Sequence, residues 1–301
     1  MNSVVAVVVT YNRKDMLTEC LQALKAQSKP CDVIVVDNCS TDGTREMMAE
    51  LVKTDKRLTL FCMEKNEGGA GGFYAGMKLA AERGYGYVWL MDDDTLAKPD
   101  ALEQLLMADE QLQGNYGWLS SVVLWKDGRE CKMNRQKLKK SYYDYAEYLK
   151  YGIVQAEQAT FVSLFVPMKT IKKVGLPIRQ FFIWGDDIEY TRRITVRNEL
   201  PGFIAGQSQV IHAMKQNCGS SIASDDVERI SRYNYAFRNE NYLYRKEGIK
   251  GFLYYSAKCG MNFCRIWMKA KDHKCARSWI IVKNYVKGLF FNPSIETIKS
   301  E

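Results

Sequence analysis

The sequence predicts an α/β fold with a mostly parallel central sheet. Short runs rich in Val and Ile alternate with segments of helical periodicity over the first 117 residues, which is the pattern of repeated strand–helix units. These runs show little alternation of polar and apolar residues, as is typical of strands buried on both faces. The chain has 301 residues, 47% hydrophobic and 26% charged, so it is long enough for a large α/β domain with a smaller appendage.

Four buried strands and their helices account for the first part of the chain. We expect strands at 3–10, 31–36, 58–62 and 87–91. We expect helices at 13–27, from Thr41 or Asp42 to about 53, from the glycine-rich loop 66–72 to residue 83, and after Pro99. In open α/β sheets, ligands bind at the carboxyl ends of the strands. Polar and glycine residues follow all four strands here, so we expect a site at this edge.

The next hundred residues have a less regular pattern. We expect strands at 116–125 and 159–167, with a hairpin turn at 126–129 and an ordered insertion rich in Lys and Tyr at 134–152. The segment 181–190 should lead into a helix that ends at about 197, and two short strands are expected within 203–212. Helices rich in aromatic and basic residues follow from about residue 225.

The charge is unevenly distributed between the two parts of the chain. We predict one domain at 1–220, with a first half at about 1–115 and a second half at about 116–220, and a helical region at 221–301. The net charge is +8, but 228–301 alone holds 15 Lys and Arg against 6 Asp and Glu, a net +9. This asymmetry favours an anionic partner for the last part of the chain, such as membrane lipid, nucleic acid or an anionic glycan carrier.

The nine cysteines and the start of the chain indicate an intracellular protein. No CxxC pair or Cys and His cluster with zinc-ligand spacing is present, so we interpret the cysteines as reduced thiols, mostly in the core. The apolar start is too short for a secretory leader and lacks a basic lead-in. No stretch approaches the ~20 apolar residues that span a bilayer. We expect a cytoplasmic location.

Three adjacent carboxylates, Asp92, Asp93 and Asp94, follow the fourth strand. They repel one another unless a positive charge lies between them. In an extended segment Asp92 and Asp94 point to the same side, where they could hold one Mg²⁺ or Mn²⁺ ion together with substrate phosphates. A solvated acidic turn that caps the next helix is the plainer alternative.

A second acidic pair, Asp186 and Asp187, lies in the aromatic segment FFIWGDDIEY. Burial raises a carboxylate pKa toward the range of a general base, although Asp at a helix start is also an ordinary cap. His212 follows an expected strand and could be a metal ligand, a phosphate donor or a structural residue. The loop 68–72 lacks the spacing of a nucleotide-binding fingerprint, which leaves close backbone approach to a ligand or a flexible turn.

The order of these motifs resembles that of the family 2 inverting glycosyltransferases, which have the GT-A fold. The similar segments are VVVTYNRKDMLTECLQAL, VIVVDNCSTDGT, NEGGAGGFYAGM and WLMDDD, and the likeness covers about residues 3–215. The DDD motif and the later FFIWGDDIEY followed by a His most resemble galactofuranosyltransferases, and rhamnosyltransferases of surface polysaccharide synthesis are similar. The chain lacks the extra N-terminal domain of the polymerising enzymes, so we expect single or short additions.

The resemblance implies that 1–220 is a catalytic domain, with a donor-binding half at about 1–115 and an acceptor half at about 116–220. It also implies a role for each matching residue. Thr10, Asn12, Arg13 and Asp37 would line the base and ribose pocket, and Asn66 and Gly69 would lie near the ribose and diphosphate. Asp92, Asp94 and His212 would hold Mn²⁺ or Mg²⁺, and Asp93 would lie near the donor sugar or ribose. Asp187 would be the catalytic base with Asp186 beside it, and Asp186 and Trp184 would shape the acceptor site.

The implied function is inverting transfer of a sugar to a hydroxyl of a glycan or lipid-linked glycan in polysaccharide synthesis. Galactofuranose from UDP-galactofuranose is the first expectation for the donor, and rhamnose from dTDP-rhamnose is the alternative. A nucleotidyltransferase would need a glycine-rich phosphate loop where this chain has TYNRKD. A non-enzymatic protein that binds anionic surfaces leaves both acidic motifs unexplained, and no nucleic-acid motif is present.

The basic helical region admits two interpretations. Its Lys, Arg and aromatic residues suit the anionic inner face of the cell membrane, which would make the enzyme a peripheral membrane protein near a lipid-linked acceptor. The alternative is a bundle that packs on the catalytic domain or on a second copy of the chain in a homo-oligomer.

Overall fold

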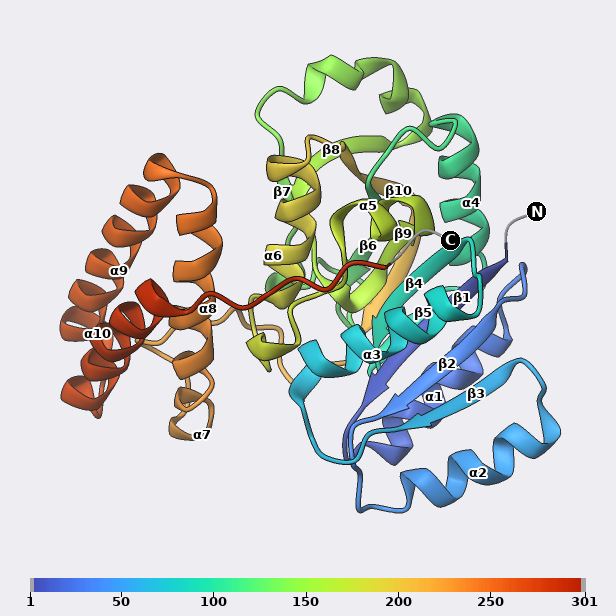
Figure 1. Ribbon diagram of the computed structural model, residues 1–301, viewed down its shortest axis with the longest axis horizontal. Coiled ribbons are helices and arrows are strands. Elements are labelled where there is room, and N and C mark those ends of the chain that lie inside the picture. Colours follow the sequence, from blue (N-terminus) through green and yellow to red (C-terminus); the bar gives the residue numbers. More distant parts are fainter. Residues whose placement is uncertain (1–2, 299–301) are drawn as a thin grey trace.

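Four parallel strands form one half of a ten-stranded sheet in the computed structural model, which describes residues 3–298 (Figure 1). They are β1 (Val4–Thr10), β2 (Asp32–Asp37), β3 (Leu58–Cys62) and β4 (Tyr87–Asp92), in the order β3-β2-β1-β4. All four agree with the sequence prediction to within a residue or so. Their carboxyl ends lie at one edge of the sheet, because parallel neighbours run in the same direction.

Helices cover both faces of this half, and each face has its own core. The helices are α1 (Lys14–Lys25), α2 (Thr44–Thr54), α3 (Gly68–Glu82) and α4 (Ala101–Gln111). Successive side chains of a strand point to opposite faces. Ala6 and Val8 of β1 therefore pack in the core with α1 and α4, whereas Val5 and Val7 pack in the core with α3. A strand that is apolar at every position is thus buried on both sides.

The glycine-rich segment is the start of α3, and the prediction of a loop there was wrong. A Cβ on Gly72 would lie 2.4 Å from Val9, and one on Gly76 would lie 2.3 Å from Val7. These glycines bring α3 into close contact with β1. At these two positions the close backbone approach is therefore between helix and strand, and not between backbone and a ligand. Gly68 has a φ of +73°, and a Cβ there would lie 2.0 Å from the carbonyl oxygen of Phe182.

Beyond β4 the sheet is mixed, so the expectation of a mostly parallel sheet holds only for its first half. The later strands are β5 (Thr95–Ala97), β6 (Trp118–Leu124), β7 (Lys137–Leu138), β8 (Ile153–Gln158), β9 (Leu164–Pro167) and β10 (Gly202–His212). Strand β9 pairs antiparallel with β4 and β6, and β10 pairs parallel with β6 and antiparallel with β5 and β8.

Two expectations for this half need correction, and a third is confirmed. The two short strands expected within 203–212 are one strand, β10, with an irregularity between Ala205 and Gln209. Only the second part of 159–167 is a strand, and β8 was not predicted. The insertion at 134–152 is ordered, since it carries β7 and the 3-10 segment η2 (Tyr142–Tyr151), whose Tyr145 packs edge-on against Phe203.

The segment before the second acidic pair leads through α5 (Met168–Val174) and η4 (Arg179–Phe181) to α6 (Asp186–Arg192). The helix then continues as one π-helical turn, η5 (Arg193–Arg197). The expected helix through about 197 is therefore present.

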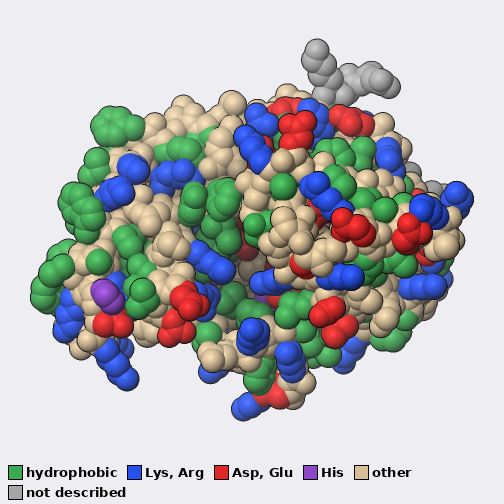
Figure 2. Space-filling model, turned by 90° about the horizontal axis from the view of Figure 1, so that it is seen from below, with side chains coloured by type: hydrophobic (Ala, Val, Ile, Leu, Met, Phe, Trp, Pro, Cys, Tyr) green, Lys and Arg blue, Asp and Glu red, His purple; other side chains and the backbone are tan. Residues whose placement is uncertain are grey.

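Four helices form the last part of the chain, beside the sheet (Figure 1). They are α7 (Val227–Ile230), α8 (Tyr233–Lys246), α9 (Ile249–Lys269) and α10 (Lys274–Phe290). The chain after α10 returns to α3, where Glu296 accepts hydrogen bonds from Tyr74 and Lys78. Hydrophobic side chains gather on the outer side of this helical region (Figure 2).

Two further expectations concern cysteines and membrane spans. The nine cysteines are all unpaired, but only Cys20, Cys31, Cys131 and Cys259 are buried, so the expectation that most lie in the core was wrong. Among residues 3–298, no helix has the length and apolar character needed to cross a bilayer.

Candidate active site

The three carboxylates after β4 separate into two groups. Asp93 accepts a hydrogen bond of 2.8 Å from the Thr10 hydroxyl and one of 3.2 Å from Arg13. Arg13 also donates to Oδ2 of Asp94 at 2.8 Å. The ligand atoms of Asp92 and Asp94 instead form a cluster with His212, as the alternation of side chains along an extended segment predicts.

His212 reaches the cluster because β10 pairs with the short strand β5. His212 lies opposite Thr95 in this pairing, and the next residue, Ala213, donates its N–H to the carbonyl oxygen of Asp94. The imidazole Nε2 lies 2.9 Å from Oδ1 of Asp94. The sheet thus brings into contact two side chains, Asp94 and His212, that lie far apart in the sequence.

Asn134 sets the tautomer of His212. Its amide oxygen lies 2.7 Å from Nδ1 of the imidazole, and an amide oxygen only accepts hydrogen bonds. Nδ1 therefore carries the proton, and Nε2 of the neutral ring points a lone pair at the carboxylates. This is the arrangement of metal-binding histidines, whose second nitrogen donates to an oxygen of the outer shell.

The donor set fits a divalent cation. One ligand atom from each of Asp92, Asp94 and His212 lies within 4.8 Å of the other two. Oδ1 of Asp94 is buried and has no hydrogen-bond donor other than His212, which can donate from Nε2 only when both ring nitrogens are protonated. A hard cation would satisfy this oxygen and let His212 stay neutral.

The electrostatics of the triad also favour a cation. Burial raises the pKa of Asp92 to about 7, and the charge of Asp94 adds to the shift. Burial raises the pKa of Asp93 to about 6 against the opposing effect of Arg13. Burial acts on Asp94 too, but His212 and Arg13 outweigh it and lower its pKa. Burial would lower the pKa of His212, but its contact with Asp94 raises it to about 10.

The residues expected at the nucleotide pocket lie around the ends of β1, β2 and the start of α3. Asn12 accepts the N–H of Thr41 at 2.7 Å and thereby joins the loops after β1 and β2. Asp37 is fully buried and is paired with Arg45 at 2.5 Å, a partner that the sequence analysis did not identify. Asn66 accepts the N–H of Gly68 at 2.8 Å and so shapes the start of α3.

Gly69 differs from its neighbours in this helix turn. A Cβ built on it would meet no atom within 4 Å, so the space above this residue is open. Of the glycines in this run, Gly69 is the one whose surroundings leave room for the expected close approach of a ligand to the backbone.

The second acidic pair begins α6 and follows a strained loop. Phe182 and Trp184 have φ values of 64° and 62°, a left-handed conformation that non-glycine residues rarely adopt. Burial and the charge of Asp187 raise the pKa of Asp186 well above its ordinary value, and burial raises the pKa of Asp187 to about 6. Asp92 contributes to the shift of Asp186, so the two acidic sites lie within electrostatic range of each other.

Trp184 packs toward the helical region. Its ring lies edge-on to Tyr233 at 4.9 Å, and the guanidinium of Arg229 lies 5.7 Å from it. The side chain is half-buried in the core of α7 to α10. The indole expected at the acceptor site therefore also joins the two parts of the chain.

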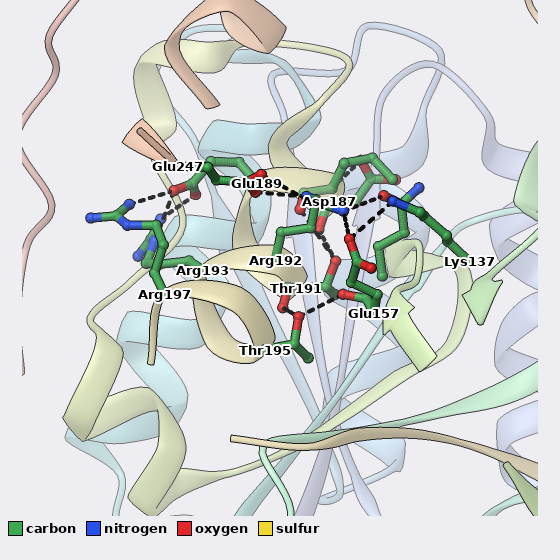
Figure 3. A network of polar contacts seen from close by, with 12 residues as sticks. Lys137, Glu157, Asp187, Glu189, Thr191, Arg192, Arg193, Thr195, Arg197 and Glu247 are labelled. Carbon is green, nitrogen blue, oxygen red and sulfur yellow. Dashed lines mark hydrogen bonds and ion pairs between the residues drawn. The ribbon is translucent and has the colours of Figure 1, made fainter. Parts of the chain in front are cut away.

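A network of ion pairs holds α6 in place (Figure 3). Arg192 donates two hydrogen bonds of 2.7 Å to Glu247 at the end of α8, and it also contacts Glu157 of β8. Glu189 and Arg193 form a second, fully buried pair behind the same helix. These contacts fix the helix that carries the acid pair against both the sheet and the helical region.

Sequence reasoning missed several residues that shape the site. Four of them position the predicted groups through partners that are distant in the sequence or lie on another element: Asn134, Asn239, Arg45 and Arg192. Asn134 lies in the Lys-rich insertion, which carries no motif. An Asn or Arg at these positions does not by itself indicate, in the sequence, that the residue makes these contacts.

Comparison with known proteins agrees with this geometry. The family profile described as Glycosyl transferase family 2 matches residues 5–153. The galactofuranosyltransferase GlfT1 of Mycobacterium tuberculosis is 29% identical over 269 residues, which cover 83% of this chain and 85% of the relative. The chain belongs to glycosyltransferase family 2. This family 2 glycosyltransferase is also 36% identical over 99 residues to the putative teichuronic acid biosynthesis glycosyltransferase TuaG of Bacillus subtilis, 32% of this chain and 38% of that protein.

The fold of this family 2 glycosyltransferase is GT-A. It resembles the crystal structure of GalNAc-T7 with UDP, GalNAc and Mn²⁺, with a TM-score of 0.66 at 11% identity. The likeness covers 96% of this chain and 56% of GalNAc-T7. The prediction of a GT-A glycosyltransferase is therefore confirmed.

Proposed function

We propose that this enzyme transfers galactofuranose from UDP-galactofuranose, with inversion, to a hydroxyl of a glycan or lipid-linked glycan. The observation that carries the proposal is the convergence of Asp92, Asp94 and His212 beside the acid pair of α6. The sugar is suggested by the GlfT1 relative, which is a galactofuranosyltransferase and matches over most of both chains. A role in cell-surface polysaccharide synthesis follows from the same relative and from TuaG.

Asp92, Asp94 and His212 would hold Mn²⁺ or Mg²⁺, which supplies positive charge against the departing diphosphate. Thr10 and Arg13 hold Asp93 in place, and Asp93 would lie near the donor sugar or ribose. Arg13 is half-exposed and keeps donors for the nucleotide. Asn12, Asp37, Asn66 and Gly69 would complete the base, ribose and diphosphate pocket.

Asp187 is the proposed general base. Its carboxylate would take the proton of the acceptor hydroxyl while that oxygen attacks the anomeric carbon from the face opposite the leaving group. A pKa of about 6 leaves it ionised at neutral pH yet more basic than an exposed carboxylate. Asp186 and Trp184 would shape the acceptor side.

A donor panel tests this proposal. The thermal stability of the protein is measured with UDP-galactofuranose, UDP-galactopyranose, dTDP-rhamnose and GDP-mannose, each with and without Mn²⁺. We expect the largest rise in Tm with UDP-galactofuranose and Mn²⁺. A larger rise with dTDP-rhamnose would assign the rhamnosyl alternative, and no rise with any sugar nucleotide would contradict the proposal.

We further propose that α9 and α10 rest on an anionic membrane surface. Exposed apolar side chains recur at helical spacing along each helix, as on one face. On α10 they are three and four residues apart, at Trp279, Val282, Val286 and Phe290, and on α9 they are eight and seven residues apart, at Leu253, Met261 and Met268. Lys and Arg residues lie among them, and Figure 2 shows the apolar groups at the outer side of this region. Apolar and cationic side chains together suit anionic lipid.

Liposome flotation separates this proposal from a homo-oligomer. We expect the protein to float with phosphatidylglycerol vesicles, and the double variant Met268→Glu, Trp279→Glu to stay in solution. If the protein forms a dimer in light scattering that the same variant abolishes, while neither protein binds vesicles, the apolar face is an interface between copies.

A further inference from the structure

A hollow of about 700 Å³ lies between the loop before the acid pair and the helices α8 and α10. Its lining consists of Phe182, Ile183, Ser231, Arg232, Asn234, Tyr235, Arg238, Lys283, Asn284 and Lys287. The hollow therefore adjoins the segment that carries Trp184 and the proposed base.

The lining is strongly cationic. Arg232, which immediately precedes α8, Arg238 of α8 and two Lys side chains of α10 line it, and none of the described lining residues is Asp or Glu. Lys283 and Lys287 are four residues apart on α10, a spacing at which like charges repel on one helix face. In the part of the chain that the structure describes, Arg232, Lys283 and Lys287 take part in none of the ion pairs. No ion pair among the described residues therefore neutralises these three side chains.

The walls of the hollow are held in fixed positions. Arg238 donates to the carbonyl oxygens of Gln180 and Phe181 and lies 4.1 Å from the ring centre of Phe291. The rings of Phe182 and Tyr235 stack at 4.9 Å. Asn284 donates to Asn234 at 2.8 Å across the gap between α10 and α8. A recess with fixed walls and free cations is suited to a ligand.

The hollow lies toward the triad but differs from it chemically. Burial lowers the pKa of Arg232, and the nearby cations Arg229 and Arg13 lower it further. Arg13 is the residue that contacts Asp93 and Asp94, so Arg232 is within electrostatic range of the proposed donor site. A lining without carboxylates cannot hold a divalent cation, so the ligand should be an anion bound directly by Arg and Lys.

We propose that this hollow binds a phosphate or diphosphate group carried by the acceptor, and that this contact places the acceptor sugar at the acid pair. The inference rests on the proposed glycosyl transfer for the role of the group. The site itself requires only an anion with several oxygens. Its volume exceeds that of one phosphate, which leaves room for a diphosphate and part of the attached sugar.

Calorimetric titration with inorganic pyrophosphate in EDTA tests the site without the donor metal. The pocket variant is Lys283→Gln, Lys287→Gln, and the control is Lys250→Gln, Lys269→Gln on α9, which changes the net charge equally outside the hollow. We expect wild type and control to bind pyrophosphate alike, and the pocket variant at least tenfold more weakly. Absence of binding by the folded wild type, or an equal loss in the control, would overturn the proposal.

Two further measurements on the same variants separate the other outcomes. We expect all three proteins to bind UDP with Mn²⁺ equally, and a wild type that fails to do so would contradict the proposed function and leave the pyrophosphate result standing. In flotation with phosphatidylglycerol vesicles, we expect the pocket variant to bind like the control. If it loses vesicle binding but keeps pyrophosphate binding, the two lysines belong to the membrane surface and the proposal is wrong.

Discussion

The side-chain amide of Asn239 on α8 donates a hydrogen bond of 2.8 Å to the carbonyl oxygen of Trp184. The same amide donates to the carbonyl oxygen of Phe181 at 3.0 Å, and Asn239 is fully buried. The loop between these carbonyls contains the left-handed Phe182 and Trp184, a conformation that costs about 1–3 kcal/mol per residue. The C-terminal helices therefore hold the strained loop that leads into the acid pair.

Replacement of Asn239 by Ala should lower catalysis through this loop. The variant removes the Asn239 donor from the carbonyl oxygen of Trp184, which costs about 1–3 kcal/mol, and releases the loop before α6. We expect kcat to fall at least tenfold with an unchanged Kd for UDP and Mn²⁺. Asn198→Ala, which removes another amide-to-carbonyl contact, is the matched control. An unchanged kcat in the Asn239 variant would show that the loop does not need this contact.

Replacement of Asn134 by Ala should weaken metal binding. Without its acceptor at Nδ1, His212 is no longer held in the tautomer that presents Nε2 to the cluster. Loss of such an outer contact lowers metal affinity by about 10–100-fold. Titration of Mn²⁺ followed by electron paramagnetic resonance measures this, with the half-buried amide variant Gln104→Ala on α4 as control. Equal Mn²⁺ affinity in both variants would exclude an orienting role for Asn134.

The acid limb of the kcat profile should lie near pH 6. Burial raises the pKa of Asp187 to about 6, and a general base must be ionised, so activity is present above this pH and lost as the pH falls through it. The profile is measured at saturating donor and Mn²⁺, so that metal affinity does not contribute. Asp187→Asn should abolish transfer and keep UDP binding. A limb near pH 4, or transfer by the Asn variant at the wild-type rate, would contradict the assignment.

The ion pairs of Arg192 predict an asymmetry in stability. Arg192→Ala leaves Glu247 without its partner and leaves Glu157 with Lys137 alone, and removal of one member of a buried pair costs about 3–5 kcal/mol. Glu247→Ala should lower the free energy of unfolding by less, because Arg192 keeps its ion pair with Glu157. Urea unfolding measures both free energies, with the exposed pair variant Glu50→Ala as a reference near zero. Equal costs for the Arg192 and Glu247 variants would mean that Glu157 does not share the arginine.

The parts of the fold that the sequence predicted well are those with a strong local signal. The strands β1 to β4 are continuous apolar runs bounded by turns, so their limits are visible in the chain itself. The glycine run was assigned to a loop because Gly lowers helix propensity, yet Gly72 and Gly76 serve the packing of α3 on β1. Tertiary contact here outweighs a local preference that sequence reasoning relies on.

The candidate site likewise contains some residues that the sequence predicted and others that it did not. The carboxylates of 92–94 and 186–187 are visible as motifs, and the contact of His212 with Asp94 agrees with the ligand set that the family resemblance implied. Asn134 and Asn239 were not visible, because an isolated Asn is ordinary in any sequence and its role depends on which carbonyl or imidazole the fold places beside it. Contacts of this kind, between residues far apart in the sequence, can be identified only from the structure.

The central claim is a metal-dependent donor site at Asp92, Asp94 and His212. Calorimetric titration of UDP into wild type and Asp94→Ala, each with Mn²⁺ and with EDTA, tests it most directly. The account predicts binding only to the wild type with Mn²⁺, and loss of that binding by at least a hundredfold in the variant or in EDTA. Equal binding of UDP in EDTA, or by the folded Asp94→Ala variant, would contradict it.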